Sequence, residues 1–310
     1  MAWAELSDVR CYYELHGEGE PLLLVPGLGG NCRVWDPIAP LLADQFSLIL
    51  FDNRGIGRSA PRRKPRTLAD YSADMAELLD VLRLDRAHVL GLSLGGIIAQ
   101  RFAIDHPGRV DRLVLVSCTD RFSAYLLRIT ALLGHSLRRF PRRVFVQMME
   151  LLCTAPLYLD ANVEQLDAAA EERCKAGVQP RALGTQLRAL LRSEVDPADY
   201  RITAPTLVVA GEHDALIPNC YARLMAGKIP GSQFALIPGA GHNPMAEMPD
   251  VVLPMIAKFL RTGEVDDTAP APRVAAAKHP ARHPSRFETK DVPAPLVDRL
   301  ATFAPEGRPR

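Results

Sequence analysis

Short apolar runs alternate along the chain with longer stretches in which apolar residues recur every three or four positions. Four nearly continuous apolar runs lie in the first part of the chain, at 21–25, 47–51, 88–90 and 112–116. Strands buried on both faces of a parallel sheet have this pattern, because neither face needs polar residues. Helical periodicity separates them, at 34–42, at 68–82 and from 96 to about 105. This alternation predicts a doubly wound α/β fold.

The same alternation returns near the end of the chain. Two more apolar runs lie at 205–210 and 233–237, and a last helix is expected near 251–260. The segment 4–15 can supply two short antiparallel strands at the sheet edge. Together these segments predict a mostly parallel, eight-stranded sheet.

A long stretch without strand candidates interrupts the alternation between about 120 and 200. Its helical segments lie at 125–133, 144–152, 163–176 and 182–191, and prolines punctuate them. We interpret this stretch as a helical cap inserted over the active-site face. The predicted domains are therefore a core at 1–119 and 201–262, a cap at 120–200 and a tail at 263–310.

The predicted tail is rich in Pro, Ala, Arg and charged residues. Such a composition cannot bury enough apolar surface to offset the entropy of ordering, so we expect the tail to be largely disordered. A short helical segment at 296–303 can dock on the body or on a partner. His279 and His283 stand four residues apart, but Pro280 opposes the helix that would bring them together at a metal.

The candidate chemistry begins at Gly91-Leu92-Ser93-Leu94-Gly95, which follows an apolar strand and precedes a helix. When a strand is followed by G-x-S-x-G and then by a helix, the serine lies on a strained turn between the two elements. The glycines permit the backbone to reverse direction there. The helix directs its free N–H groups and its positive end at charge that develops on a substrate there. Ser93 is therefore the predicted nucleophile, against the alternative of an incidental glycine turn.

A serine nucleophile needs an imidazole base and a carboxylate that orients the imidazole. Asp214 follows the strand at 205–210, and His242 lies in a glycine-rich loop after the last strand. Their order after Ser93 is the one that accompanies this turn. The alternatives are His213 as base, and Glu212 or Asp120 as acid.

The oxyanion formed during acyl transfer needs two backbone N–H donors. The residue after the nucleophile, Leu94, supplies one, and Leu28 in the loop Pro26-Gly27-Leu28-Gly29-Gly30 supplies the other. A phosphate cradle is the competing interpretation of that loop. Neither a P-loop lysine nor a Rossmann glycine pattern accompanies it, so nucleotide binding is not expected.

Composition limits the kinds of molecule that the protein is expected to bind. The 310 residues are 48% hydrophobic, and 37 Lys+Arg against 36 Asp+Glu give a net charge of +1, so no bulk field favours nucleic acid or a membrane surface. The cysteines lack metal-ligand spacing and are expected to be free thiols: Cys11, Cys32, Cys118, Cys153, Cys174 and Cys220. The first six residues do not resemble a signal peptide, and no membrane-spanning run is apparent. We expect a cytoplasmic protein that acts on a small molecule without a cofactor or metal.

With these motifs the chain resembles the α/β-hydrolase superfamily over residues 22–260. The resemblance includes its cap-bearing serine hydrolases: enol-lactone hydrolases, cofactor-free haloperoxidase-type esterases and aminoacrylate-hydrolase-like proteins. Further marks are the loop at 51–59, in which Arg54 and Ser59 are expected to be structural, and Glu247 with Pro249 after His242. Many members carry His-Gly where this chain has Pro26-Gly27, which alters the support of the oxyanion loop. A serine at the elbow, rather than an aspartate, speaks against dehalogenase and epoxide-hydrolase chemistry.

The expected reaction is hydrolysis of a small carboxylic ester, lactone or thioester through an acyl-enzyme on Ser93. Candidate substrate contacts near the site are Trp35, Phe122, Tyr125, Phe145 and Met149. One alternative is C–C bond hydrolysis of a ring-cleavage product, which needs a positive residue for a substrate carboxylate. The cap arginines that could serve are Arg121, Arg128, Arg138, Arg139, Arg142 and Arg143. The other alternative is a non-catalytic ligand-binding protein.

Overall fold

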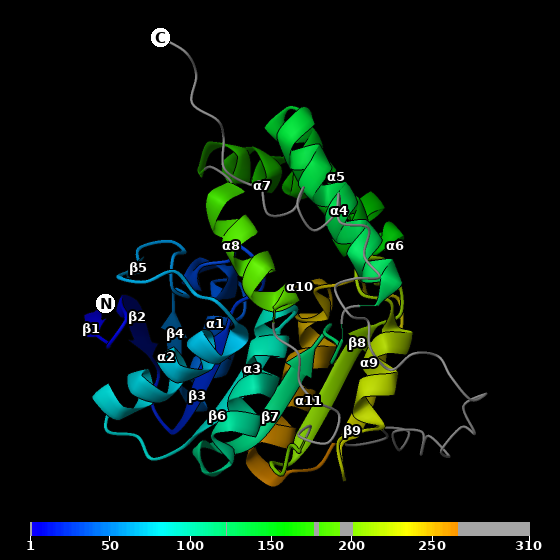
Figure 1. Ribbon diagram of the computed structural model, residues 1–310. Helices are drawn as coiled ribbons and strands as arrows, with labels where there is room; N and C mark the ends of the chain where they lie inside the picture. Colours follow the sequence, from blue (N-terminus) through cyan, green and yellow to red (C-terminus); the bar gives the residue numbers. More distant parts are fainter. Residues whose placement is uncertain (1, 122, 177–179, 193–200, 266–310) are drawn as a thin grey trace, which may run out of the picture.

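A central β-sheet organises the computed structural model, which describes residues 2–121, 123–176, 180–192 and 201–265 (Figure 1). Its strands follow the order β1-β2-β4-β3-β6-β7-β8-β9, and the two-residue strand β5 pairs with β2. The strand bounds are β1 (Ala2–Glu5), β2 (Val9–His16), β3 (Glu20–Val25), β4 (Phe46–Phe51), β5 (Ala60–Pro61), β6 (Ala87–Leu92), β7 (Val110–Val116), β8 (Thr206–Gly211) and β9 (Gln233–Ile237).

The sheet is parallel from β4 to β9, and antiparallel pairs involve β1, β2 and β5. The predicted doubly wound, mostly parallel α/β fold is thus confirmed. Its eight predicted strands correspond to the eight that form the continuous path. Strand β5 was not predicted, since two residues are too short to produce a hydrophobic pattern.

Helices cover both faces of the sheet. Helices α2 (Leu68–Val81), α3 (Leu94–Asp105) and α9 (Asn219–Ala226) pack in one hydrophobic cluster with one face. Helices α1 (Ala39–Ala43) and α11 (Pro249–Thr262) pack in a second cluster with the other face. The strands between these layers are apolar on both faces because both faces are buried.

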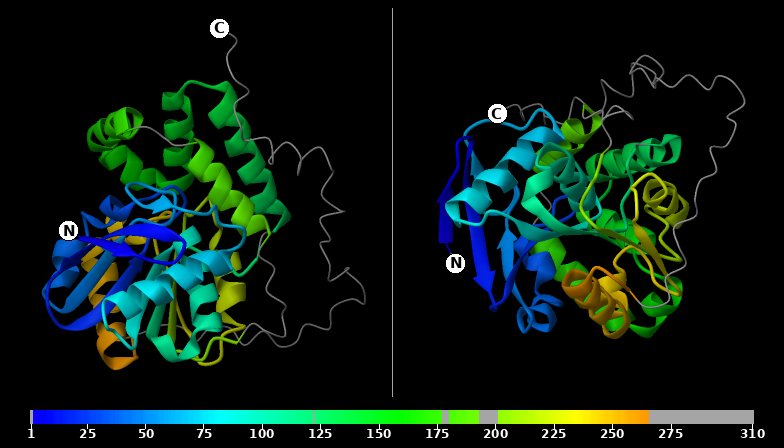
Figure 2. Two further views of the ribbon diagram at one scale, coloured as in Figure 1. Left: turned by 60° about the vertical axis from the view of Figure 1, so that its left-hand side comes forward. Right: turned by 90° about the horizontal axis from the view of Figure 1, so that it is seen from below.

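Helices α4 to α8 form a separate layer beyond the end of the sheet (Figures 1 and 2). This helical insertion follows β7 and precedes β8, and its helices are α4 (Ala124–Arg139), α5 (Arg142–Cys153), α6 (Pro156–Ala161), α7 (Val163–Ala176) and α8 (Pro180–Leu191). The helical cap expected from the sequence is therefore present as an insertion. The division of the chain into domains at residues 120 and 200 stays a prediction.

Short elements account for most of the differences from the expected pattern. The helix expected at 34–42 is two pieces, the 3-10 helix η1 (Cys32–Trp35) and α1, because Pro37 lies between them and lacks an N–H donor. Two other short helices also begin at prolines: the 3-10 helix η2 (Pro107–Arg109) and the α-helix α10 (Pro244–Glu247). Helices α6 and α9 were not predicted, since their periodic patterns are short.

The structure does not describe residues beyond 265, and most of the expectations for the tail concern those residues. They include the helical segment at 296–303 and the histidines at 279 and 283. Among the helices of the described residues, none is both long and apolar enough to span a membrane.

Candidate active site

Ser93 occupies a strained turn between β6 and α3. Its backbone lies at φ 56° and ψ −122°, a region that residues with a side chain rarely adopt. The Ser93 N–H donates to the carbonyl of Val116 at 2.9 Å, so the neighbouring strand β7 holds the turn. Strain of this kind persists only where the surrounding structure fixes the conformation, and it is typical of functional sites.

The glycines beside Ser93 permit the turn. A Cβ atom on Gly91 would lie 2.5 Å from the Gly95 carbonyl oxygen, and one on Gly95 would lie 2.0 Å from the Val25 carbonyl oxygen. These neighbours are backbone atoms and cannot rotate away. Both positions of the motif therefore require glycine for a steric reason that the structure shows directly.

Asp214 and His242 form a buried acid–base pair. His242 Nδ1 lies 2.7 Å from Asp214 Oδ2, and the two side chains are 7% and 0% exposed. Asp214 Oδ1 accepts the N–H groups of Leu216 at 3.0 Å and Ile217 at 2.8 Å. Because a carboxylate can only accept, the proton sits on Nδ1, which leaves Nε2 of His242 as a base.

The parallel strands bring these residues to one edge of the sheet. Leu92 pairs in register with Val116, and Gly211 pairs with Ile237, so β6, β7, β8 and β9 end together. The serine, the acid and the histidine each follow one of these strands. Sites in open α/β sheets form at this carboxyl edge.

The alternative base and acids lie in other surroundings. His213 Nε2 lies 3.8 Å from a carboxylate oxygen of Glu212, and both side chains are about half exposed. The carboxylate of Asp120 forms a close ion pair with the ammonium of Lys228. Among these candidates, the contact that orients an imidazole against a buried carboxylate is the one between Asp214 and His242.

The predicted oxyanion loop forms a tight turn beside the serine. The Gly30 N–H donates to the Gly27 carbonyl at 3.1 Å, and Gly29 has a φ of +70°. A Cβ atom on Gly27 would lie 4.0 Å from Ser93 Oγ, so this turn, here called the oxyanion turn (27–30), begins against the nucleophile. Leu28 is the next residue of this turn, and its role as an oxyanion donor stays a prediction.

Leu94 lies at the start of helix α3. It is buried, and it is the first helical residue after Ser93. The first N–H groups of a helix have no partner within the helix, so they are available to an anion at its N-terminus. Leu94 thus lies at the N-terminus of α3, and its role as an oxyanion donor stays a prediction.

Glu247 supports the loop that carries His242. One carboxylate oxygen accepts the N–H groups of Gly241 at 2.8 Å and Ala155 at 3.1 Å, and the other accepts that of Asn243 at 3.4 Å. Burial raises the pKa of Glu247 above its ordinary value, although these backbone donors oppose the shift. In the sequence, Glu247 is only one of the residues that mark the resemblance, without a role. Its link between the histidine loop and the insertion includes Ala155, which lies 92 residues away in the chain.

The helical insertion also contacts the acid and histidine loops directly. The His242 N–H donates to the Cys153 carbonyl at 2.8 Å. The Tyr125 hydroxyl donates to the carbonyl of Ala215, next to the acid, at 2.7 Å. Tyr125, a predicted substrate contact, is therefore a link between α4 and the acid loop.

The other predicted substrate contacts have different positions. Trp35 is 1% exposed and packs in the hydrophobic cluster with α1 and α11, so it belongs to the core rather than to an open pocket wall. Phe145 and Met149 lie half-buried on α5. Phe122 lies outside the described residues.

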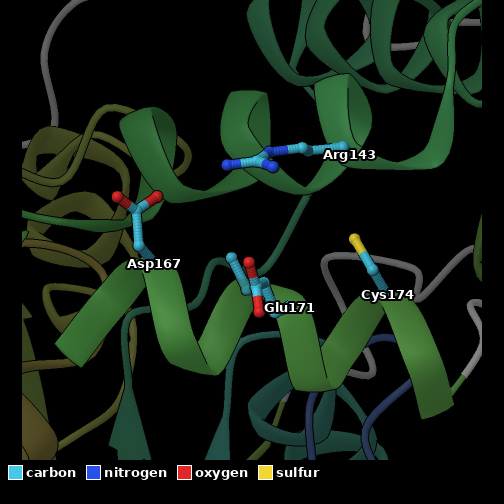
Figure 3. Close-up of a pocket in the computed structure, with 5 residues that line it drawn as sticks. Arg143, Asp167, Glu171 and Cys174 are labelled. Carbon is cyan, nitrogen blue, oxygen red and sulfur yellow. The ribbon is translucent and has the colours of Figure 1, made fainter. Parts of the chain in front are cut away.

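A cavity of about 230 Å³ lies between α5 and α7 of the insertion, and its lining does not include the predicted triad residues (Figure 3). Arg143 extends from α5 toward α7, which carries Asp167, Glu171 and Cys174. Of the other arginines considered for a substrate carboxylate, Arg142 donates to the Cys174 carbonyl. Both arginines thus lie against other residues of the insertion.

Arg54 and Ser59 have structural contacts, as the resemblance implied. The buried guanidinium of Arg54 forms a bidentate ion pair with Asp74, and burial raises the pKa of that carboxyl to about 6. Ser59 accepts the N–H of Tyr12 at 2.9 Å and donates to the carbonyl of Asp52 at 2.6 Å. These bonds fix the loop after β4.

The described residues contain free cysteines, in agreement with their spacing. Within the same residues, no group of three or more His, Cys, Asp or Glu is arranged to hold a metal ion.

Comparison with known proteins places the chain in a family. Residues 20–249 match the family model described as the alpha/beta hydrolase fold. A relative from Azorhizobium caulinodans, named "Putative carbamate hydrolase RutD", is 30% identical over 266 residues, which are 86% of this chain and 100% of that protein.

Solved structures of other hydrolases also resemble this chain. A thermophilic esterase from Thermogutta terrifontis is 27% identical with a TM-score of 0.71, and the match covers 85% of this chain and 99% of that one. The enol-lactonase from Burkholderia xenovorans LB400 is 21% identical with a TM-score of 0.73, covers 84% and 100%, and supports the fold. The chain therefore belongs to the α/β-hydrolase family and is a hydrolase of that fold.

Proposed function

We propose that the protein is a serine hydrolase that cleaves a small carboxylic ester, lactone or thioester through a Ser93, His242 and Asp214 triad. The observation that carries this proposal is the 2.7 Å contact between His242 Nδ1 and the buried Asp214, at the sheet edge where Ser93 forms a strained turn. A hydroxyl nucleophile, an oriented imidazole and helix N–H donors are the requirements for acyl transfer.

In the first half of the reaction, Ser93 Oγ attacks the substrate carbonyl carbon while His242 Nε2 takes the hydroxyl proton. The negative charge on the carbonyl oxygen is stabilised by the N–H groups of Leu28 and Leu94. When the tetrahedral intermediate collapses, the bond to the leaving group breaks and His242 donates its proton to the leaving oxygen or sulfur. An acyl-enzyme on Ser93 results.

In the second half, water attacks the acyl carbonyl and His242 takes a proton from it. The bond to Ser93 Oγ breaks, the serine recovers its proton from the imidazolium, and a carboxylic acid leaves. Throughout, the Asp214 carboxylate stabilises the imidazolium without accepting its proton.

Apolar surface near the site favours an uncharged substrate. Phe145 and Met149 are half-buried on α5, and Leu28, whose N–H is a predicted oxyanion donor, is 37% exposed. The 27% identity to a solved esterase supports an ester as the substrate. The arginines of the insertion give weaker support to C–C bond hydrolysis, because Arg142 is bonded to the Cys174 carbonyl.

A carbamate is the second candidate substrate. It is favoured by the name of the relative from Azorhizobium caulinodans, which matches this chain over 86% of its length. The same triad can attack a carbamate carbonyl, and the first step would then form a carbamoyl-enzyme on Ser93. Hydrolysis of a small ester or of a small carbamate by this mechanism needs no cofactor.

Covalent labelling and turnover test the proposal together. A fluorophosphonate probe should label the wild-type protein at Ser93, and p-nitrophenyl butanoate and a p-nitrophenyl carbamate should distinguish the two substrates by kcat/KM. Ser93→Ala should lose labelling and turnover, whereas Ser123→Ala, at the N-cap of α4, should retain both. Full turnover by Ser93→Ala, or labelling elsewhere, would refute the Ser93 mechanism, whereas a wild-type protein with neither labelling nor turnover would favour a ligand-binding protein.

A further inference from the structure

A glutamine of the helical insertion contacts the oxyanion turn (27–30). Gln186 lies on α8, is 1% exposed, and its Oε1 accepts the N–H of Gly29 at 2.8 Å. The two residues are 157 positions apart in the chain. Figure 1 shows α8 reaching down toward the end of the sheet where α3 begins. The amide is therefore buried at the junction of the insertion and the oxyanion turn.

Leu183 packs on the same turn. A Cβ atom on Gly29 would lie 2.6 Å from Leu183 Cδ2, so the backbone of the turn fits closely under α8. Leu183 and Gln186 are three residues apart and thus lie on one face of the helix. An apolar and a polar side chain of α8 together hold the oxyanion turn.

The hydrogen bond from Gly29 fixes the middle peptide of the turn. With Gly30 bonded to Gly27, the peptide that joins Leu28 to Gly29 is the central one, and it can rotate between turn types. Gln186 Oε1 holds its N–H in one direction. The amide oxygen thus fixes the peptide that follows Leu28, and it acts on the Leu28 N–H, in the preceding peptide, only through the conformation of the turn.

The nitrogen of the same amide has no such partner. Gln186 Nε2 is buried and lacks a hydrogen-bond partner in the part of the chain that the structure describes. Buried polar groups are almost always paired, and an exception at a site calls for an explanation. Because Nε2 shares its carbon with Oε1, this free donor lies close to the oxyanion turn, where an oxygen of a bound substrate can accept it.

We propose that Gln186 selects substrates whose acyl group carries an oxygen acceptor, with Oε1 positioning the oxyanion turn and Nε2 donating to that acceptor. This inference rests on the proposed esterase-type function and specifies its substrate class as oxygen-bearing acyl esters rather than plain alkyl esters. A site with a buried donor discriminates against an analogue that lacks the acceptor, because the donor is then left unpaired.

Matched substrates isolate this contact. p-Nitrophenyl methoxyacetate and butanoate differ by one oxygen in place of a CH₂ group, and 3-methoxypropanoate and pentanoate repeat the pair one atom further out. The ratio of kcat/KM within each pair is measured for the wild type, Gln186→Met and Gln186→Glu. Intrinsic reactivity cancels when these ratios are compared between proteins. Gln147→Met, the same change at an exposed glutamine of α5, is the control.

In at least one pair, Gln186→Met should lower the ratio for the oxygen-bearing ester by about 3- to 12-fold, the range of one neutral hydrogen bond. Gln186→Glu keeps an oxygen for Gly29 and removes the donor, so it decides the question if Gln186→Met does not fold. Gln147→Met should keep the wild-type ratios. Ratios that stay within about twofold in both pairs would overturn the inference while Ser93-dependent turnover still supports the proposed function. A wild-type protein without Ser93-dependent turnover would instead refute both.

Discussion

Replacing Asp214 with asparagine should leave the fold intact and nearly abolish turnover. The asparagine oxygen can still accept the N–H groups of Leu216 and Ile217, which Asp214 Oδ1 accepts at 3.0 and 2.8 Å. The new NH₂ group would stand where Oδ2 lies 2.7 Å from His242 Nδ1. Since two donors cannot face each other, the imidazole proton moves to Nε2, and the ring can no longer accept the serine proton.

The expected loss in kcat is about 10,000-fold, the effect of the wrong imidazole tautomer in a serine triad. At about 1.36 kcal/mol for each factor of ten, this corresponds to about 5.5 kcal/mol of lost transition-state stabilisation. The assay is p-nitrophenyl butanoate hydrolysis, normalised to the active sites that a fluorophosphonate titrates in the wild type. Urea unfolding shows whether Asp214→Asn retains wild-type stability.

Glu212→Gln is the matched control. It makes the same change of charge two residues earlier, on a side chain that is about half exposed. Its kcat should stay within about twofold of wild type, as expected for a surface substitution. If a folded Asp214→Asn variant kept kcat within about tenfold of the wild type, Asp214 would not set the tautomer of His242, and the assignment of the triad would be wrong.

Three further variants test the turn at Ser93, the loop that carries His242 and the buried pair of Asp74 with Arg54. Gly95→Ala would place a Cβ atom 2.0 Å from the Val25 carbonyl oxygen, so it should lower the free energy of unfolding by about 3 kcal/mol or more in urea titrations, whereas Gly108→Ala, with open space around its Cβ, should not. Glu247→Gln should weaken charge-assisted bonds to the histidine loop, costing about 1.5 to 3 kcal/mol in unfolding free energy and lowering kcat more than KM; unchanged stability and kcat would exclude this role. Burial raises the pKa of Asp74 to about 6, so the folded state binds its proton more tightly than the unfolded state, and this group's contribution to stability falls as pH rises from about 4 to about 6. Asp74→Asn should remove that part of the pH dependence, and identical slopes in the two proteins would contradict the raised pKa.

The strand pattern predicted the sheet because its strands are long and buried on both faces. Apolar runs such as 21–25 and 112–116 are too short for a buried helix and lie between helical segments, which favours buried strands. Strand β5 and helices α6 and α9 were missed because short segments carry little periodicity. Proline explains the break between η1 and α1, which the apolar pattern alone did not indicate.

The local motif at Ser93 could be predicted because neighbouring residues determine its turn. Contacts between distant residues could be predicted for Asp214 and His242, which lie in recognisable motifs, but not for pairs outside such motifs. Gln186 and Gly29 are 157 positions apart, and Glu247 and Ala155 are 92 apart, so no local pattern relates them. Trp35 illustrates the same limit, because an apolar residue near a loop has one sequence signature whether it lines a pocket or fills the core.

The backbone bond from His242 to Cys153 has a consequence for protein engineering. Together with the Glu247 bond to Ala155, it joins the histidine loop to the segment between α5 and α6 without using the side chains of that segment. A graft of a relative's insertion onto this core would therefore have to keep the backbone path at 153–155, with a small residue at the fully buried position 155. Chimeras that keep this path should be the ones in which new specificity is acquired with the catalytic base still in place.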